Sequence, residues 1–334
     1  MVPGGACTRL GADRLPPLEG EAWPVPSLGS NGTITTILSP ALSLKERVFI
    51  LQTRKPMPAT TVLFATYNEP QWLEWVLWGY ANQTERDFEV LVVDDGSREE
   101  TRNLINRLRP QLPYRLRHFW QPDEGFQKCK AMNRGVLLAQ SEYVIFTDGD
   151  CIPHPEFVAR HLALRARSRY LTGGYSKLPL ALSQRITRED ILAGRATDYA
   201  WLAANGLERH TLKLRLKNET LRSIFNTITP VKSRLHGHNA SAWRDDLMRV
   251  NGYDERMQYG GEDLELGERL THAGVRGKTI RYSAICVHLE HKRGYVTPEM
   301  RQKNQLIRDA TRRDRAIWTP HGIDKHVDEL NNAS

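Results

Sequence analysis

The chain has 334 residues, of which 40% are hydrophobic and 26% charged, a composition that is ordinary for a globular protein. No run approaches the roughly 20 apolar residues that span a bilayer, and the apolar core of a signal peptide is missing after the start. The net charge of +8 favours anionic partners, such as nucleotides, phosphorylated lipids, a membrane surface or nucleic acid.

Cysteine usage argues against a zinc knuckle and against a disulfide framework. Cys7, Cys129, Cys151 and Cys286 are scattered, and none belongs to a Cys-x-x-Cys pair. Such a chain suits a reducing compartment. We therefore expect a cytoplasmic protein, with the inner face of the membrane as the alternative location.

The first half of the chain predicts a regular alternation of strands and helices. Residues 1–58 are rich in Pro, Gly and small residues, which indicates a partly disordered leader. Buried strands and amphipathic helices then alternate, with strands expected over 61–65, 88–93, 116–120 and 143–146 and helices over 72–82, 99–108 and 125–140. This alternation is typical of an α/β fold with a mainly parallel sheet flanked by helices.

The second half is less regular. Its periodicity predicts helices over 156–169, 244–250 and 264–273 and strands over 170–175 and 279–287. Residues 176–234 mix many Arg and Lys with Leu and Ile, which fits either an amphipathic insertion that faces a membrane or acceptor, or a plain solvated helical face. We expect a single large domain with two halves, 59–155 and 156–300, and a charged helical C-terminal extension over 301–334.

Polar clusters follow three of the predicted strands, at Thr66-Tyr67-Asn68-Glu69, Asp94-Asp95-Gly96-Ser97 and Thr147-Asp148-Gly149-Asp150. Because the carboxyl ends of parallel strands meet at one edge of a sheet, these clusters predict a ligand site there. Two carboxylates one residue apart repel unless a cation lies between them, although an isolated Asp-Gly-Asp is more often a solvated turn. Without a Gly-x-Gly-x-x-Gly or Gly-Lys-Ser/Thr loop, a dinucleotide dehydrogenase and a phosphate-loop NTPase are disfavoured.

A further acidic cluster, Gly260-Gly261-Glu262-Asp263, stands at the start of a predicted helix. Acids in a first helical turn suit the helix dipole, which is the simplest interpretation of this pair. Paired glycines, however, also let the backbone come close to a ligand. His288 and His291 follow the last predicted strand.

The order and spacing of these motifs resemble the family 2 glycosyltransferases of the GT-A fold, over about residues 60–300. More narrowly, they resemble the bacterial members that build lipopolysaccharide, capsule or other surface polysaccharide. Residues 237–293 are similar to the C-terminal region of galactosyltransferase-like enzymes. The resemblance implies a GT-A (Rossmann-like) sheet, with a nucleotide-sugar-binding half at 59–155 and an acceptor-binding half at 156–300.

The resemblance also implies an activity. It is that of an inverting, metal-dependent hexosyltransferase that moves a sugar from a nucleoside-diphosphate sugar, with a UDP-linked hexose expected, to a hydroxyl of a glycan or glycolipid. Asp263 would be the general base for that hydroxyl, and Glu262 would hold the acceptor or the donor sugar. Residues implied at the donor are Thr66, Asn68, Glu69, Asp94, Asp95, Ser97, Lys128, Asn133 and Asp148.

The implied cofactor is Mn²⁺ or Mg²⁺, which would neutralise the leaving diphosphate. Asp150 would be its main ligand, with Asp148, His288 and His291 as further ligands. In the family a late histidine next to Arg or Lys binds the metal, and His291 ahead of Lys292-Arg293 fits best. The doubled histidine leaves the ligand set open, and His236 and His238 receive no assignment.

Two other classes of function remain open at this point. A sugar nucleotidyltransferase would share the sheet and the acidic metal ligands, but would carry a glycine-rich basic loop after the first strand, where this chain has Thr66-Tyr67-Asn68-Glu69-Pro70. A non-catalytic nucleic-acid-binding protein would suit the positive charge, although the charge is spread out and no binding motif accompanies it. The expected partners are thus a nucleotide-sugar donor, a glycan or glycolipid acceptor and a membrane met through the basic surface, and not nucleic acid.

Overall fold

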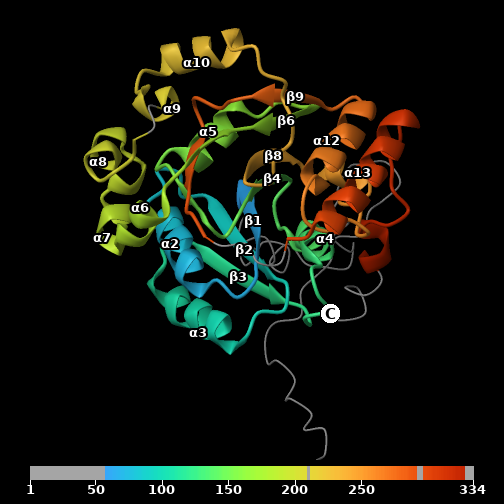
Figure 1. The fold of residues 1–334 in the computed structure, drawn as a ribbon, viewed down its shortest axis with the longest axis horizontal. Coiled ribbons are helices and arrows are strands. Elements are labelled where there is room, and N and C mark those ends of the chain that lie inside the picture. Colours follow the sequence, from blue (N-terminus) through green and yellow to red (C-terminus); the bar gives the residue numbers. More distant parts are fainter. Residues whose placement is uncertain (1–56, 209–210, 292–295, 328–334) are drawn as a thin grey trace, which may run out of the picture.

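A computed structural model describes residues 57–208, 211–291 and 296–327 of the chain (Figure 1). Almost all of the predicted leader, residues 1–56, lies outside the described residues, as do residues 328–334 of the predicted extension.

A seven-stranded sheet with the strand order β3-β2-β1-β4-β8-β6-β9 forms the centre of the molecule. Four of its strands come from the first half of the chain and pair in parallel: β1 (Thr60–Thr66), β2 (Phe88–Asp94), β3 (Arg115–Trp120) and β4 (Tyr143–Thr147). All but β3 are almost wholly buried, as expected for apolar runs covered on both faces. The predicted α/β fold with a mainly parallel sheet is confirmed.

The second half of the chain completes the same sheet. β8 (Asn239–Trp243) runs antiparallel between β4 and β6 (Arg169–Thr172), and β9 (Arg276–Thr279) pairs in parallel with β6. The two predicted halves therefore share one sheet and form one domain.

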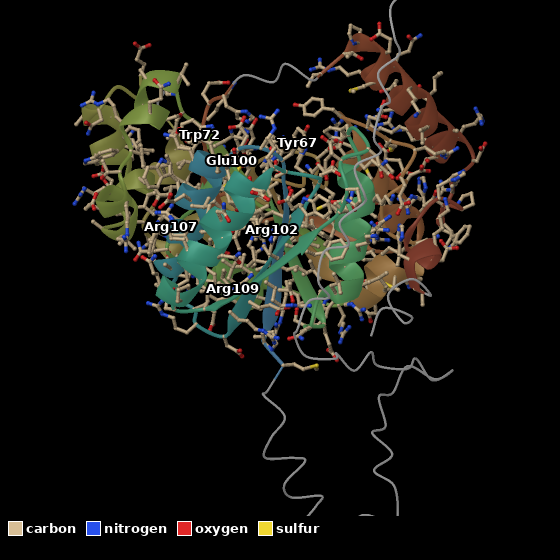
Figure 2. The ribbon with its side chains drawn as sticks, turned by 90° about the horizontal axis from the view of Figure 1, so that it is seen from below. Tyr67, Trp72, Glu100, Arg102, Arg107 and Arg109 are labelled. Carbon is tan, nitrogen blue, oxygen red and sulfur yellow. The ribbon has the colours of Figure 1, made fainter. Side chains whose placement is uncertain are left out.

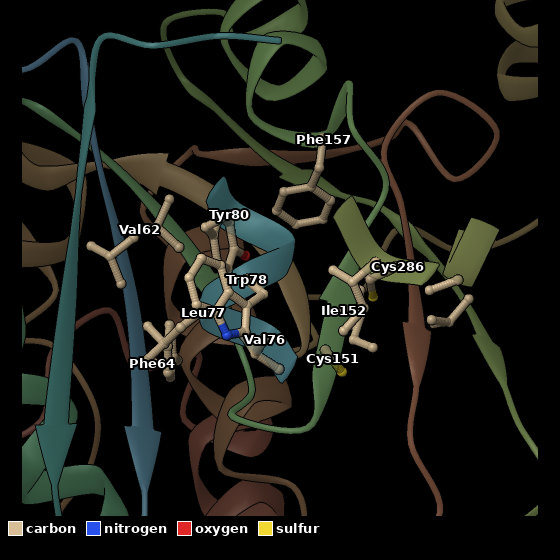
Figure 3. Packing of buried hydrophobic residues seen from close by; sticks show 14 of the residues in the cluster. Val62, Phe64, Val76, Leu77, Trp78, Tyr80, Cys151, Ile152, Phe157 and Cys286 are labelled. Carbon is tan, nitrogen blue, oxygen red and sulfur yellow. The ribbon is translucent and has the colours of Figure 1, made fainter. Parts of the chain in front are cut away.

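Helices cover both faces of this sheet, because the side chains of each strand alternate between two cores. In β1, Val62 and Phe64 belong to the core under α2 (Pro70–Ala81) and α3 (Glu99–Leu108), which Figure 3 shows in part. Leu63 belongs to the other core, which lies under α4 (Lys128–Leu138), α11 (Arg244–Arg249) and α12 (Glu262–His272). The helix predicted over 99–108 has those bounds.

A second, three-stranded sheet has the order β5-β10-β7. β10 (Ile285–His288) pairs antiparallel with β5 (Cys151–Pro153) and parallel with β7 (Gly174–Lys177). The stretches 170–175 and 279–287, each predicted as one strand, contain strand residues but divide between the two sheets. The first divides at Gly173, where a Cβ atom would lie 2.0 Å from the Asn239 side chain, and the second at a turn over 280–284, where the Ala284 N–H bonds the Ile280 carbonyl.

The segment that the sequence left unclear consists of short helices along one side of the molecule (Figure 1). They are α6 (Leu180–Arg185), α7 (Arg188–Leu192), α8 (Tyr199–Ala204), α9 (Leu212–Arg215) and α10 (Glu219–Ile228). The preceding α5 (Phe157–Leu164) is shorter than the predicted 156–169, because the chain enters β6 at Arg169. Three single turns of 3-10 helix complete the described elements: η1 (Arg109–Gln111), η2 (Arg195–Thr197) and η3 (Ile323–His326).

The C-terminal extension packs on the domain. α13 (Pro298–Arg313) lies along α12, and its Arg308 and Arg312 both reach the Glu268 carboxylate, at 2.7 and 2.6 Å. Asn304 of α13 and Ile323 of η3 are fully buried. Among the described residues, no helix combines the length and the apolar character that a membrane span requires.

Candidate active site

A cavity of about 870 Å³ opens where β1, β4 and the strands of the small sheet end, and α12 closes one of its sides. Eleven of the residues that the sequence places at a site line it: Thr66, Asn68, Glu69, Asp95, Lys128, Asp148, Asp150, Glu262, Asp263, His288 and His291. The structure thus brings together the motifs that lie between residues 66 and 291 of the sequence. Figure 2 shows Tyr67, from the loop after β1, among the labelled side chains near the surface.

Asp94 and Ser97 do not line this cavity. The Asp94 carboxylate accepts a hydrogen bond from the Ser97 N–H (2.7 Å) and lies 3.0 Å from Nε2 of His118. The Ser97 hydroxyl in turn accepts from the Asn68 N–H at 2.9 Å. These two residues link the loops after β1 and β2, so they support the cavity wall without lining it.

Asn133 also lies away from the cavity. Its amide nitrogen donates to the Tyr253 carbonyl and to the Glu255 carboxylate, both at 2.9 Å, and its oxygen accepts from the Tyr253 N–H at 2.7 Å. The side chain is fully buried. Its three bonds fasten α4 to the turn at Asn251-Gly252-Tyr253, and the donor contact expected of it stays a prediction.

Asp95, the residue after β2, has a carboxylate that faces the cavity. It accepts hydrogen bonds from the Gln121 amide (2.7 Å) and from the Gln127 N–H (2.8 Å). Burial raises the pKa of Asp95 to about 6, although these two bonds oppose the shift. The site therefore holds a fixed hydrogen-bond acceptor at the edge of β2.

Asp150, His288 and His291 converge at the end of the small sheet. Oδ2 of Asp150 lies 2.8 Å from Nε2 of His291 and 3.3 Å from Nε2 of His288. The local backbone explains the meeting, because His288 pairs with Cys151 across β10 and β5, and the Leu289 N–H bonds the Asp150 carbonyl at 2.9 Å.

This group fits a divalent cation by its donor atoms. The ligand atoms of Asp150, Cys151 and His288 lie within 4.8 Å of one another. A carboxylate beside two imidazoles suits Mn²⁺ better than Mg²⁺, which prefers oxygen ligands alone. Cys151 is a poor candidate, because burial raises the pKa of its thiol well above the usual value and a metal binds the thiolate. Lys292 and Arg293, the neighbours that single out His291 in the sequence, lie outside the described residues.

Asp148 belongs to a different group, which surrounds the ammonium of Lys128. Nζ of Lys128 lies 3.1 Å from Oδ1 of Asp148 and 3.8 Å from Oε1 of Glu262. Burial disfavours the charged ammonium, but the carboxylates of Asp148, Asp263 and Glu262 outweigh it, so the pKa of Lys128 lies well above its usual value. Lys128 therefore keeps its positive charge amid these three carboxylates.

Glu262 and Asp263 open α12 after two glycines with positive φ, Gly260 (101°) and Gly261 (95°). The Glu262 carboxylate accepts from the Gly260 N–H at 2.8 Å. Burial, together with repulsion from Asp263, raises the pKa of Glu262 to about 7 against the pull of Lys128.

The Asp263 carboxylate is held by two neighbours. Its Oδ1 accepts a hydrogen bond from the Tyr253 hydroxyl at 3.1 Å. It also lies against Gly237, where a Cβ atom would come within 2.5 Å of the same oxygen. Any larger residue at position 237 would displace the carboxylate. Asp263 is thus fixed in place while it still faces the cavity.

The cavity wall also contains residues that were not predicted from the sequence: Phe126, Tyr175, Lys177, His238, Tyr259 and Met300. The Tyr175 ring meets the His238 ring edge to face at 4.4 Å. Burial lowers the pKa of His238 to about 4, so this imidazole is neutral at neutral pH. The Lys177 ammonium pairs with Glu290 at 2.5 Å. The histidines at positions 236 and 238 could have marked this part of the site in the sequence. No local sequence pattern, however, connects them with Tyr175 of β7.

Two family models match the chain. The model for glycosyl transferase family 2 matches residues 61–174, and the model for the N-terminal domain of galactosyltransferase matches residues 230–292. Together they cover the loops after β1, β2 and β4, the start of α12, and His288 and His291.

Curated relatives are glycosyltransferases and polysaccharide synthases. Validoxylamine A glucosyltransferase of Streptomyces hygroscopicus is 29% identical over 257 residues, which are 71% of this chain and 57% of that protein. Hyaluronan synthase of Pasteurella multocida is 30% identical over 234 residues, which are 66% of this chain and 23% of that protein. The chain thus spans little more than half of the first relative and less than a quarter of the second.

Solved structures share the fold. A mannosyltransferase from Pyrobaculum calidifontis, in complex with GDP-Man and Mn²⁺, superposes with a TM-score of 0.50 at 20% identity, covering 75% of this chain and 64% of that one. Residues 1–349 of S. aureus TarS, in complex with UDP-GlcNAc, superpose with a TM-score of 0.51 at 18% identity, covering 82% of this chain and 72% of that one. At these identities the likeness establishes the fold and nothing finer.

Proposed function

Because this chain belongs to the family 2 glycosyltransferases and has their GT-A fold, we propose that it transfers a sugar from a nucleoside-diphosphate sugar, with inversion, to a hydroxyl of a glycan or glycolipid. The observation that carries this proposal is the convergence of six carboxylates, three histidines and two lysines in one cavity. Of the two alternatives, neither the sugar nucleotidyltransferase nor the nucleic-acid-binding protein gains support from the family models or relatives.

The donor is proposed to bind along the edge of β1, β2 and β4. Asp95 offers a buried carboxylate oxygen to the N–H groups of a base. Lys128 offers a fixed positive charge beside Asp148, where a phosphate or sugar hydroxyl would lie. A UDP-linked hexose is the proposed donor, and of two solved structures that share the fold one holds GDP-Man and the other UDP-GlcNAc.

We propose that Asp150, His288 and His291 hold a divalent cation, with Mn²⁺ preferred. The bound cation would supply positive charge that stabilises the leaving diphosphate. The support in this chain is the short distance from both imidazoles to one carboxylate oxygen. The mannosyltransferase of the same fold was solved with Mn²⁺.

Asp263 is the proposed general base. A hydroxyl is a poor nucleophile at neutral pH, so a carboxylate within reach must take its proton as the oxygen attacks. The new bond forms between that oxygen and the anomeric carbon, the bond from the carbon to the diphosphate breaks, and the proton passes to Asp263. One displacement of this kind inverts the anomeric centre. Tyr253 and Gly237 hold the carboxylate in place for this step.

The acceptor is proposed to lie against the wall that Tyr175, His238 and Tyr259 form, because aromatic faces pack well on sugar rings. A polysaccharide or glycolipid of the cell surface is the proposed product, as in the polysaccharide synthase among the relatives. Contact with a membrane through a basic surface would bring such an acceptor to the site.

Release of free nucleoside diphosphate tests the proposal. The full chain should release UDP from a UDP-hexose in the presence of Mn²⁺, slowly with water and faster with acceptor. Release of pyrophosphate from a sugar phosphate and a nucleoside triphosphate would instead identify a nucleotidyltransferase. If a panel of UDP, GDP and dTDP sugars gave neither product nor a rise in melting temperature with Mn²⁺, the proposal would fail.

A further inference from the structure

The helix α10 is attached to the protein by its polar side. Arg222 is only 5% exposed and pairs with Glu156 at 2.7 Å. One turn further on, Asn226 donates to the Ser283 hydroxyl and accepts from the Tyr282 N–H, both at 2.9 Å. These contacts fix which side of the helix faces inward.

The opposite side of α10 is apolar and faces solvent. Leu221, Ile224 and Ile228 are 45%, 46% and 62% exposed. Their spacing of three and four residues places them on one face of the helix. An amphipathic helix of a globular protein ordinarily turns this face to the core, so the orientation of α10 is reversed. Packing among residues 57–208, 211–291 and 296–327 therefore does not explain the apolar face, whereas an external apolar partner would.

Exposed basic residues flank the helix in the chain on both sides, Arg215 and Lys217 before it and Lys232 and Arg234 after it. Between residues 212 and 234 the chain has six basic residues and a single acidic one, Glu219, which pairs with Arg160 at 2.8 Å. In Figure 1, α9 and α10 lie at the outer edge of the molecule, away from the central strands.

We propose that α10 and its basic flanks dock on the surface of a bilayer that contains anionic phospholipids. An apolar helix face with cationic residues beside it is the combination by which interfacial helices bind such surfaces. A second copy of the chain fits less well, because self-association would bring two basic segments together. The proposed function includes contact with a membrane, and α10 is the part of the chain that would make it. The biological meaning of this inference rests on that proposed function.

The docking segment is connected to the candidate active site. In α9, the Lys213 ammonium donates to the Tyr175 carbonyl and lies 5.3 Å from the centre of the Tyr175 ring. Tyr175 lines the cavity and contacts His238 there. The helix that precedes α10 therefore contacts the wall proposed for the acceptor, which suits an acceptor carried by a lipid.

Sedimentation of the full chain with vesicles tests the proposal. We expect binding to vesicles of phosphatidylcholine mixed with phosphatidylglycerol, little binding to phosphatidylcholine alone, and weakening by salt. The triple variant Leu221→Gln, Ile224→Gln, Ile228→Gln should bind the mixed vesicles at least about tenfold more weakly than the wild type, since three apolar side chains no longer enter the bilayer. Lys217→Gln with Lys232→Gln should weaken binding and reduce its salt dependence.

Matched controls are the exposed Leu306 and Ile317, which are 67% and 53% exposed. Leu306→Gln with Ile317→Gln should bind the vesicles as the wild type does. All variants should keep the wild-type melting temperature and, without vesicles, the wild-type rate of nucleoside diphosphate release, so that loss of docking and loss of the proposed activity are separate results.

Three outcomes would overturn the proposal. The first is no binding of the wild type to the mixed vesicles. The second is equal binding by wild type and triple variant. The third is a dimer, detected by light scattering, that the triple variant abolishes, because this would identify a second copy as the occupant of the apolar face.

Discussion

Two charged groups lie in the same cavity, and they differ in how their charge is balanced. In one, the Asp150 carboxylate faces the imidazoles of His288 and His291, whose ring nitrogens can offer lone pairs to a metal. In the other, three carboxylates surround the ammonium of Lys128. A cation can be recruited to the first group, whereas the second already contains one. The comparison suggests a division of labour between metal binding and proton transfer.

Removing the Asp150 carboxylate should have the largest effect. Asp150→Ala is expected to lower kcat/KM about a thousandfold, because the charge on the leaving diphosphate then lacks several kcal/mol of stabilisation. The measurement is nucleoside diphosphate release over a range of Mn²⁺ concentrations. Asp309→Asn, at an exposed carboxylate of α13, is the control and should keep full activity. Unchanged metal-dependent activity in Asp150→Ala would end the metal assignment.

Asp263→Asn should come next, with transfer lowered about 100-fold or more, as for the loss of a general base. In contrast to Asp150→Ala, it should still bind donor and Mn²⁺, because the proposed donor contacts of Asp95 and Lys128 and the proposed metal ligands Asp150, His288 and His291 are unchanged. Rates of sugar transfer and thermal shifts with donor measure the two properties. Full transfer activity in this variant would show that another group takes the proton.

Glu262 gives a prediction for stability against pH. Its pKa is about 7 in the folded protein and about 4.5 when exposed, so the folded state holds a proton that the unfolded state releases. Stability therefore falls as pH rises from 4.5 to 7. Glu262→Gln has no carboxylate to ionise and avoids this loss. Between about pH 5 and pH 8 its free energy of unfolding should therefore rise by up to about 3 kcal/mol relative to that of the wild type.

Urea unfolding at both pH values measures the difference. The exposed Glu189 supplies the control, since Glu189→Gln should change stability equally at the two pH values. If the difference in free energy of unfolding between Glu262→Gln and the wild type were the same at both pH values, Glu262 would be ionised at both, which would contradict the prediction.

Tyr253→Phe should give the smallest effect, about five- to tenfold in kcat, which corresponds to the roughly 1 kcal/mol of one hydrogen bond. The change removes only the hydroxyl that donates to Asp263 and leaves the buried ring in place. Donor KM should stay unchanged. If donor KM rose and kcat did not fall, Tyr253 would act on the donor end instead.

The first half of the fold was predictable because its strands are local apolar runs buried on both faces. β8 was missed for the opposite reason. Its Asn239 and Ser241 are buried polar residues, and both bond His161, at 3.0 and 2.8 Å. Such a strand has no apolar run to reveal it, and its polar groups are satisfied by a helix about 80 residues away.

The site divides in the same way. Polar clusters after the strands placed Asp95 and Asp150 at the cavity, because strand ends of a parallel sheet meet at one edge. Asp263 was placed there by the resemblance to the family, since its cluster opens a helix. Asn133 does not reach it, since its partner at Tyr253 lies 120 residues away in the chain. Lys177 was not predicted at the site because the pairing of β7 with β10 brings it to the cavity, and β10 lies more than 100 residues further along the chain.

Binding of Mn²⁺ to three forms of the chain tests the division of labour most directly. With UDP present, loss of the free Mn²⁺ signal in electron paramagnetic resonance reports binding to the wild type, Asp150→Asn and Asp263→Asn. We expect the wild type and Asp263→Asn to bind Mn²⁺ equally well, and Asp150→Asn to bind at least about tenfold more weakly. Equal binding by Asp150→Asn and wild type, or loss of binding in Asp263→Asn alone, would contradict the account.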